Sequence, residues 1–113
     1  LNVSHEHQTE QSGTDKNGKV KYRNVIRDLV IRNSGDGDAA DLRFKVEPVD
    51  DGMEVHLDAE TDSDGWVTVG DLTAGSRRSW MCLPTMRRVD VRVSTRWVEN
   101  GQAYERTFTT TVT

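Results

Sequence analysis

Apolar and polar residues alternate along several short stretches of the chain. In residues 40–48, ADLRFKVEP, every second residue from Leu42 to Val46 is apolar and charged residues lie between them. Residues 53–58, MEVHLD, and residues 89–97, VDVRVSTRW, repeat this alternation. A period of two is typical of a β-strand with one face on a core and the other in water. Since no segment carries the 3.6-residue period of an amphipathic helix, we predict an all-β fold.

Turn-forming residues separate these stretches. Clusters of Gly, Asp, Asn and Ser occur at NSGDGD, DDG, TDSDG and TAG, at the spacing of turns in an all-β protein. We therefore predict an antiparallel β-sandwich of about seven strands. The inward-facing apolar residues predicted to form its core are Leu42, Phe44, Val46, Val91, Val93 and Phe108.

The last hairpin allows a prediction of strand register. Asn100-Gly101 is the dipeptide favoured in a type I′ turn, because both central residues need a positive φ. With Glu99 and Gln102 flanking the turn, charged, aromatic and core residues each face a matching partner. The predicted pairs are Arg96 with Glu105, Trp97 with Tyr104, and Val93 with Phe108.

Charge is distributed unevenly along the 113 residues. The net charge is −4, yet residues 34–71 hold twelve acidic and two basic residues, and residues 72–113 hold seven arginines and three acidic residues. No stripe of Lys and Arg interleaved with aromatic residues occurs, so we expect no nucleic-acid partner. The length suits one domain with a single core.

The sequence also predicts the limits of the domain and where the protein is located. Residues 1–18 form an N-terminal strand and polar connection, and residues 19–113 form the sandwich, in a single domain. No apolar run is long enough to cross a membrane, so we expect no membrane insertion of this segment. Because the chain begins at Leu1 and carries no signal peptide, we expect a piece of a longer protein. We favour an extracytoplasmic or membrane-tethered location, set by regions outside this chain.

One segment resembles a known family of surface modules. Residues 30–44, VIRNSGDGDAADLRF, and residues 70–78, GDLTAGSRR, resemble bacterial immunoglobulin-like modules of the cell-adhesion-related (CARDB) kind. The matching positions are Ile31, Asn33, Gly35, Ala39, Leu42, Phe44, Leu72, Ala74 and Gly75. The resemblance spans roughly residues 19–113 and implies an immunoglobulin-like or fibronectin-like sandwich that serves as a stalk, spacer or adhesion module. It carries no catalytic residues to transfer, and we interpret Asn33 and Gly35 as turn residues.

Residues 60–71, ETDSDGWVTVGD, have the spacing of a calcium-binding loop. The candidate ligands are Glu60, Asp62, Asp64 and Asp71. The flanking sequence does not predict the two helices of an EF-hand, and the Asp at the twelfth position is too short for the usual bidentate contact. We therefore favour a turn between strands, formed at Asp64-Gly65, over a weak calcium site.

Few other residues suggest chemistry. His5 and His7 share a strand face and are interpreted as an exposed pair, and His56 as a surface residue. The single cysteine, Cys82, lies among apolar residues and is interpreted as a buried, unreactive thiol. The three tryptophans are interpreted as core residues, except that Trp66, next to the acidic turn, is a candidate for the tip of a loop.

These features predict a module rather than an enzyme. No phosphate loop, nucleophile elbow or Cys-x-x-Cys motif occurs, so we expect no catalytic residue and no cofactor. We expect a non-enzymatic module of a larger bacterial protein that spaces, adheres or contacts a protein or glycan partner. The alternative is an accessory domain of a secreted or membrane-anchored enzyme that binds carbohydrate or, weakly, calcium. The oligomeric state stays open.

Overall fold

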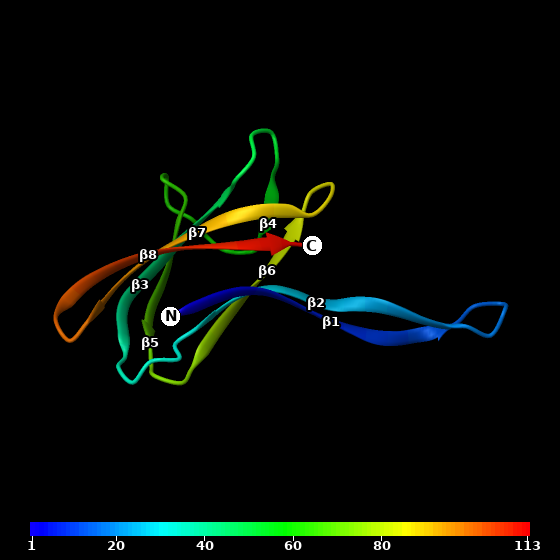
Figure 1. Ribbon diagram of the computed structural model, residues 1–113, viewed down its shortest axis with the longest axis horizontal. Helices are drawn as coiled ribbons and strands as arrows, with labels where there is room; N and C mark the ends of the chain where they lie inside the picture. Colours follow the sequence, from blue (N-terminus) through cyan, green and yellow to red (C-terminus); the bar gives the residue numbers. More distant parts are fainter.

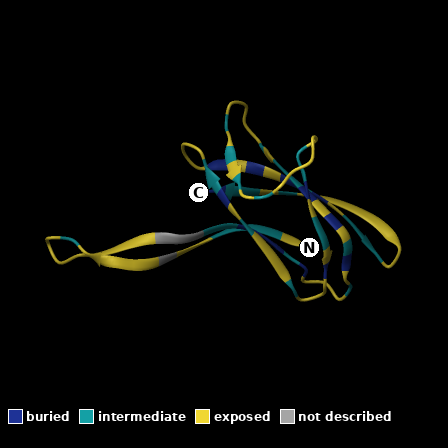
Figure 2. Ribbon diagram, turned by 180° about the vertical axis from the view of Figure 1, so that it is seen from behind, coloured by how far each residue is buried: buried dark blue, intermediate teal, exposed yellow. Residues whose placement is uncertain are grey.

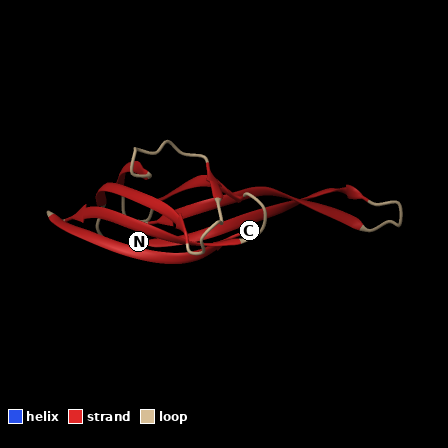
Figure 3. Ribbon diagram, turned by 90° about the horizontal axis from the view of Figure 1, so that it is seen from above, coloured by secondary structure: helices blue, strands red, loops and turns tan.

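The protein forms eight β-strands and, within the part of the chain that is described, no helix (Figure 3). The computed structural model describes residues 1–8, 10–23 and 27–113 throughout. No described segment provides a helix long and apolar enough to cross a membrane. The strands are β1 (Asn2–Thr14), β2 (Val20–Arg32), β3 (Ala39–Pro48), β4 (Val55–Leu57), β5 (Trp66–Leu72), β6 (Arg77–Pro84), β7 (Val89–Glu99) and β8 (Gln102–Val112).

The strands form two four-stranded antiparallel sheets (Figure 1). Sheet I has the order β1-β2-β6-β4, and sheet II has the order β5-β3-β7-β8. The all-β, antiparallel prediction is therefore confirmed, with one strand more than the predicted number of about seven. The strand predicted at residues 53–58 is short: only Val55–Leu57 form it, and they pair with β6.

The core lies between the two sheets, where the inward faces of the strands meet (Figure 2). Four of the six predicted core residues, Leu42, Phe44, Val91 and Val93, are fully buried. The ring of Phe44 packs against Trp80 of sheet I, with centroids 4.6 Å apart. Val46 and Phe108 are only half-buried against this core, and for them the prediction was wrong. In the case of Phe108 the reason is that β8 is the last strand of its sheet.

The β7–β8 hairpin has the predicted register. Arg96 faces Glu105, Trp97 faces Tyr104, and Val93 faces Phe108. Asn100 and Gly101 have φ values of 52° and 76°, as a type I′ turn requires. The register prediction is confirmed because it rests on a local turn signal and on pairs that are close in sequence.

The β1–β2 hairpin extends well beyond the sheets. Strand β2 pairs with β6 only from Asp28 to Arg32, so residues 10–23 form a two-stranded ribbon, which we call the arm. Among the described residues, no third strand pairs with the arm, and it projects from the body along the long axis of the molecule (Figure 1). The predicted boundary between residues 18 and 19 falls in the turn at its tip.

Candidate functional site

The acidic segment before β5 is a tight turn built around Asp62. The Asp62 Oδ1 atom accepts hydrogen bonds from the backbone N–H groups of Asp64 and Trp66, both at 2.9 Å. Gly65 donates to the Asp62 carbonyl and has a φ of 88°. These backbone bonds, that from Trp66 first, lower the pKa of Asp62. The segment is therefore a turn between strands, as predicted, and Trp66 begins the next strand.

The four candidate calcium ligands do not converge. Asp71 is five residues beyond Trp66 along β5, roughly 17 Å away at the rise of a strand. Its Oδ1 atom accepts a hydrogen bond from the Asp41 backbone N–H, while Glu60 and Asp64 are exposed in the turn segment. In residues 1–8, 10–23 and 27–113, no three His, Cys, Asp or Glu side chains are grouped so that they could hold a metal ion. The calcium affinity stays a prediction.

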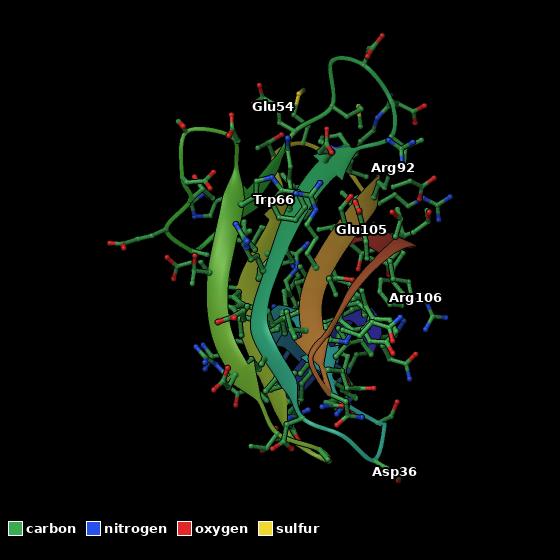
Figure 4. All side chains as sticks on the ribbon, turned by 90° about the vertical axis from the view of Figure 1, so that its left-hand side faces the viewer. Asp36, Glu54, Trp66, Arg92, Glu105 and Arg106 are labelled. Carbon is green, nitrogen blue, oxygen red and sulfur yellow. The ribbon has the colours of Figure 1, made fainter. Side chains whose placement is uncertain are left out.

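Trp66 occupies neither the core nor a loop tip. It lies on the outer face of sheet II, which Figure 4 views from outside, and the Arg96 guanidinium covers its ring at 4.6 Å from the centroid. Strands β3 and β7 present further basic residues on this face, where Arg43 faces Arg96 and Lys45 faces Trp66. This basic face was not predicted from the sequence. The polar residues that alternate with the core residues along these strands could have indicated it.

The tip of the arm is ordered by its own hydrogen bonds. The Asp15 Oδ1 atom accepts bonds from the backbone N–H groups of Asn17 and Lys19, both at 2.9 Å. Gly18 supplies the positive φ of 80° that the turn needs and donates to the Asp15 carbonyl. The arm therefore presents a defined shape at its tip.

The arm differs from the body in charge and exposure. Residues 10–23 hold four basic and two acidic residues, a net charge of +2, in a chain of net charge −4. Glu10 and Arg23 form an exposed ion pair across the two strands. Val20 is 45% exposed and Tyr22 is 67% exposed. A protein of negative net charge thus carries a basic ribbon with exposed apolar groups. The end of this ribbon is mostly exposed (Figure 2).

The histidines and the cysteine are separate features. His56 and His7 are exposed, as predicted, but His5 is half-buried and its Nε2 atom lies 2.8 Å from the Cys82 carbonyl oxygen. The prediction of an exposed pair was therefore wrong for His5, because β1 packs against the body at this point. Cys82 is buried, as predicted, and burial raises the pKa of its thiol to about 11.

Asn33 joins three chain segments near the ends of β2, β3 and β5. Its side chain is 3% exposed. The amide donates to the carbonyl oxygens of Gly37 and Leu72, at 2.8 and 2.9 Å, and its oxygen accepts from the Gly35 N–H at 3.1 Å. The interpretation of Asn33 and Gly35 as turn residues is confirmed, and the turn also ties β2 to β5.

Comparisons with known protein families, curated proteins and solved structures gave no match to this chain.

Proposed function

We propose that this chain is a non-enzymatic, immunoglobulin-like module that contacts another protein through its arm. The strand order supports the immunoglobulin-like part of the proposal. Strands β1, β2 and β6 correspond in order to A, B and E of such sandwiches, and β3, β7 and β8 correspond to C, F and G. Strand β5 extends the second sheet beside β3, and β4 extends the first beside β6.

The observation that carries the proposal is the arm itself. A two-stranded hairpin without further packing is marginally stable in water, and ordering a backbone costs about 1–2 kcal/mol per residue. The arm buries little of its own surface: Val20 and Tyr22 remain exposed. Contact with a partner would supply the burial that the body does not provide.

The chemistry of the arm indicates the kind of partner. Lys16, Lys19 and Lys21 surround the tip, and Tyr22 offers an aromatic ring with a hydroxyl group. Tyrosine is enriched at protein interfaces because its ring buries a large area and its hydroxyl can bond a polar group. The best match is an acidic protein surface with an apolar centre, which the lysines would attract over distances of about 10 Å at moderate salt.

The absence of catalysis is part of the proposal. The single thiol, that of Cys82, is buried and its pKa is raised, so it is protonated at neutral pH and unsuited to nucleophilic attack. We expect esterase, phosphatase, glycosidase and protease substrates to stay unconverted. Turnover that disappears with Cys82→Ala or His56→Ala would contradict this part.

The first test asks whether the arm is needed for folding. Replacing residues 11–22 by Asn-Gly leaves Glu10 and Arg23 flanking a two-residue turn. Because the deleted residues pair only with each other, the free energy of unfolding should change by less than about 1 kcal/mol. A body that fails to fold without them would show that the arm is structural.

The second test asks whether the arm contacts a protein. A photoreactive phenylalanine analogue placed at Tyr22, in cells that make the protein, should form a discrete adduct with one protein. The matched control is the same probe at Met86, which is 94% exposed on a loop of the body. Changing Lys16, Lys19 and Lys21 to Glu should abolish the adduct at Tyr22. Equal labelling from both positions, or none from Tyr22, would contradict the proposal.

A further inference from the structure

The four edge strands of the two sheets differ in how they are protected from pairing with another chain. Natural edges are commonly short, bulged or charged, which prevents uncontrolled pairing. Strand β4 has three residues. Strand β1 is irregular between Gln8 and Thr9 and again between Gln11 and Gly13, and the pairing of β5 with β3 is irregular on either side of Leu42. Three edges therefore carry recognisable protection.

Strand β8 is neither short nor bulged. It runs for 11 residues, Gln102–Val112, in unbroken register with β7. It contains no Pro and no Gly, and its one Glu and one Arg cancel in charge. All six of its residues after Arg106 are Thr, Phe or Val. Among the described residues only β7 pairs with it. Residues of β1 come within 8 Å of β8, Cα to Cα, but do not pair with it.

The hairpin register shows which backbone groups of β8 face outward. In a two-residue hairpin the flanking pair, here Glu99 and Gln102, exchanges both hydrogen bonds. Every second residue after Gln102 then also bonds β7. In agreement, the Arg106 carbonyl faces β7 and accepts a bond from the Thr95 hydroxyl at 2.9 Å. The residues whose N–H and C=O groups face away from β7 are Ala103, Glu105, Thr107, Thr109 and Thr111.

We propose that β8 pairs with β8 of a second copy of this chain, antiparallel and about a two-fold axis at Thr107. This inference goes beyond the proposed function, since it concerns a different surface and a different partner. Thr107 is the midpoint of Gln102–Val112, so this register pairs the whole strand. All five outward-facing residues then meet outward-facing residues of the partner strand, and the two sheets II join into one continuous eight-stranded sheet.

Side-chain pairing favours the same register. With Thr107 on the axis, Glu105 faces Thr109 of the other copy and Arg106 faces Phe108. Arg106 already covers the Phe108 ring of its own chain, at 4.9 Å from the centroid, so the same kind of contact is available between copies. Moving the axis to Arg106 or to Glu105 would place two like charges directly opposite each other, which is destabilising.

The register is tested by a cysteine at the axis. In the proposed dimer the two Thr107 residues form a hydrogen-bonded pair with Cα atoms about 5.5 Å apart, within the range that a disulfide spans. Thr107→Cys should therefore link two chains under mild oxidation. The matched control, Thr109→Cys, places its two sulfurs about four residues apart along the strands, roughly 13 Å, and should not link. Linkage through Thr109→Cys and not through Thr107→Cys would overturn the register.

The pairing is tested by concentration and by a proline. Sedimentation of the unmodified chain over about 1 µM to 1 mM should show a monomer–dimer equilibrium. Thr107→Pro removes an outward N–H that β7 does not use, so it should leave folding intact and weaken the dimer at least tenfold. Thr107→Val keeps the N–H and should still dimerise. A chain that stays monomeric at every concentration, or a dimer unaffected by Thr107→Pro, would overturn the proposal. Assembly into open-ended fibres in place of a dimer would overturn it too.

Two further readouts separate this surface from the arm. Amide exchange at Thr107 and Thr109 should slow as the protein concentration rises, whereas exchange at Arg106 and Phe108, which bond β7, should not change. The variant in which Asn-Gly replaces residues 11–22 should dimerise as the unmodified chain does. Loss of dimerisation in that variant would place the contact on the arm and overturn the role of β8.

Discussion

Replacing Asn33 by Ala should destabilise the fold more than any other change of one polar residue that keeps the backbone intact. The side chain is 3% exposed and makes three hydrogen bonds, to Gly37, Leu72 and Gly35. At about 0.5–1.5 kcal/mol for each net bond, their loss lowers the free energy of unfolding by about 2–4 kcal/mol. The bond to the Leu72 carbonyl oxygen is buried, which places the expected value in the upper half of that range.

The assay is unfolding by urea, followed by tryptophan fluorescence. Trp80 packs on Phe44 in the core, so its emission reports on the contact between the sheets. The midpoint should fall while the dependence on urea stays the same, which shows that the native fold is retained. The control is Asp36→Ala, at an exposed residue of the same loop, where we expect a change below about 0.5 kcal/mol.

A second variant tests the direction of the hydrogen bonds. Asn33→Asp keeps the size of the side chain but replaces the amide donor by an oxygen beside the carbonyl oxygens of Gly37 and Leu72. At neutral pH it should be at least as destabilising as Asn33→Ala, and less so in acid, where a protonated carboxyl group can donate one bond. A loss below about 0.5 kcal/mol for Asn33→Ala would refute the reasoning, because the three bonds would then contribute nothing net.

Further outcomes are expected at other positions. Phe44→Ala should cost about 3–5 kcal/mol of unfolding free energy, and Phe108→Ala only about 1–2, because the first ring is fully buried and the second half-buried; equal losses would contradict this. The lowered pKa of Asp62 means that its stabilising effect is present at neutral pH and lost as the pH falls through that pKa. The unfolding midpoint of the unmodified chain should therefore approach that of Asp62→Asn in acid; a constant difference would argue against it. Cys82, with a pKa of about 11, should react with a thiol reagent only on unfolding, and rapid labelling of the native chain would show otherwise. Micromolar calcium should leave the melting temperature and the Trp66 emission unchanged, since we expect a dissociation constant of about 10⁻³ M; a shift that Asp62→Asn removes would reveal a site.

Local patterns were sufficient for several strands, for the turn at Asp62 and for one register. The alternation in β3 and β7 identifies their inward faces because the side-chain period of a strand is two, whatever the strand packs against. Asn100-Gly101 defines the β7–β8 register because the turn geometry depends on two adjacent residues. The same locality explains why the turn at Asp62 was predicted: its hydrogen bonds all reach residues within four positions.

Contacts between residues distant in sequence could not be predicted from local patterns. Arg96 covers Trp66 from two strands away, and His5 reaches the carbonyl of Cys82, 77 residues on. Phe108 alternates like a core residue but lies on an edge strand, so its ring is only half covered. The arm and the open edge of β8 depend on where neighbouring strands stop. Alternation indicates which side chains share a face of a strand. Burial and free sheet edges depend instead on which strands pair and pack together, and this is determined by packing across the whole chain.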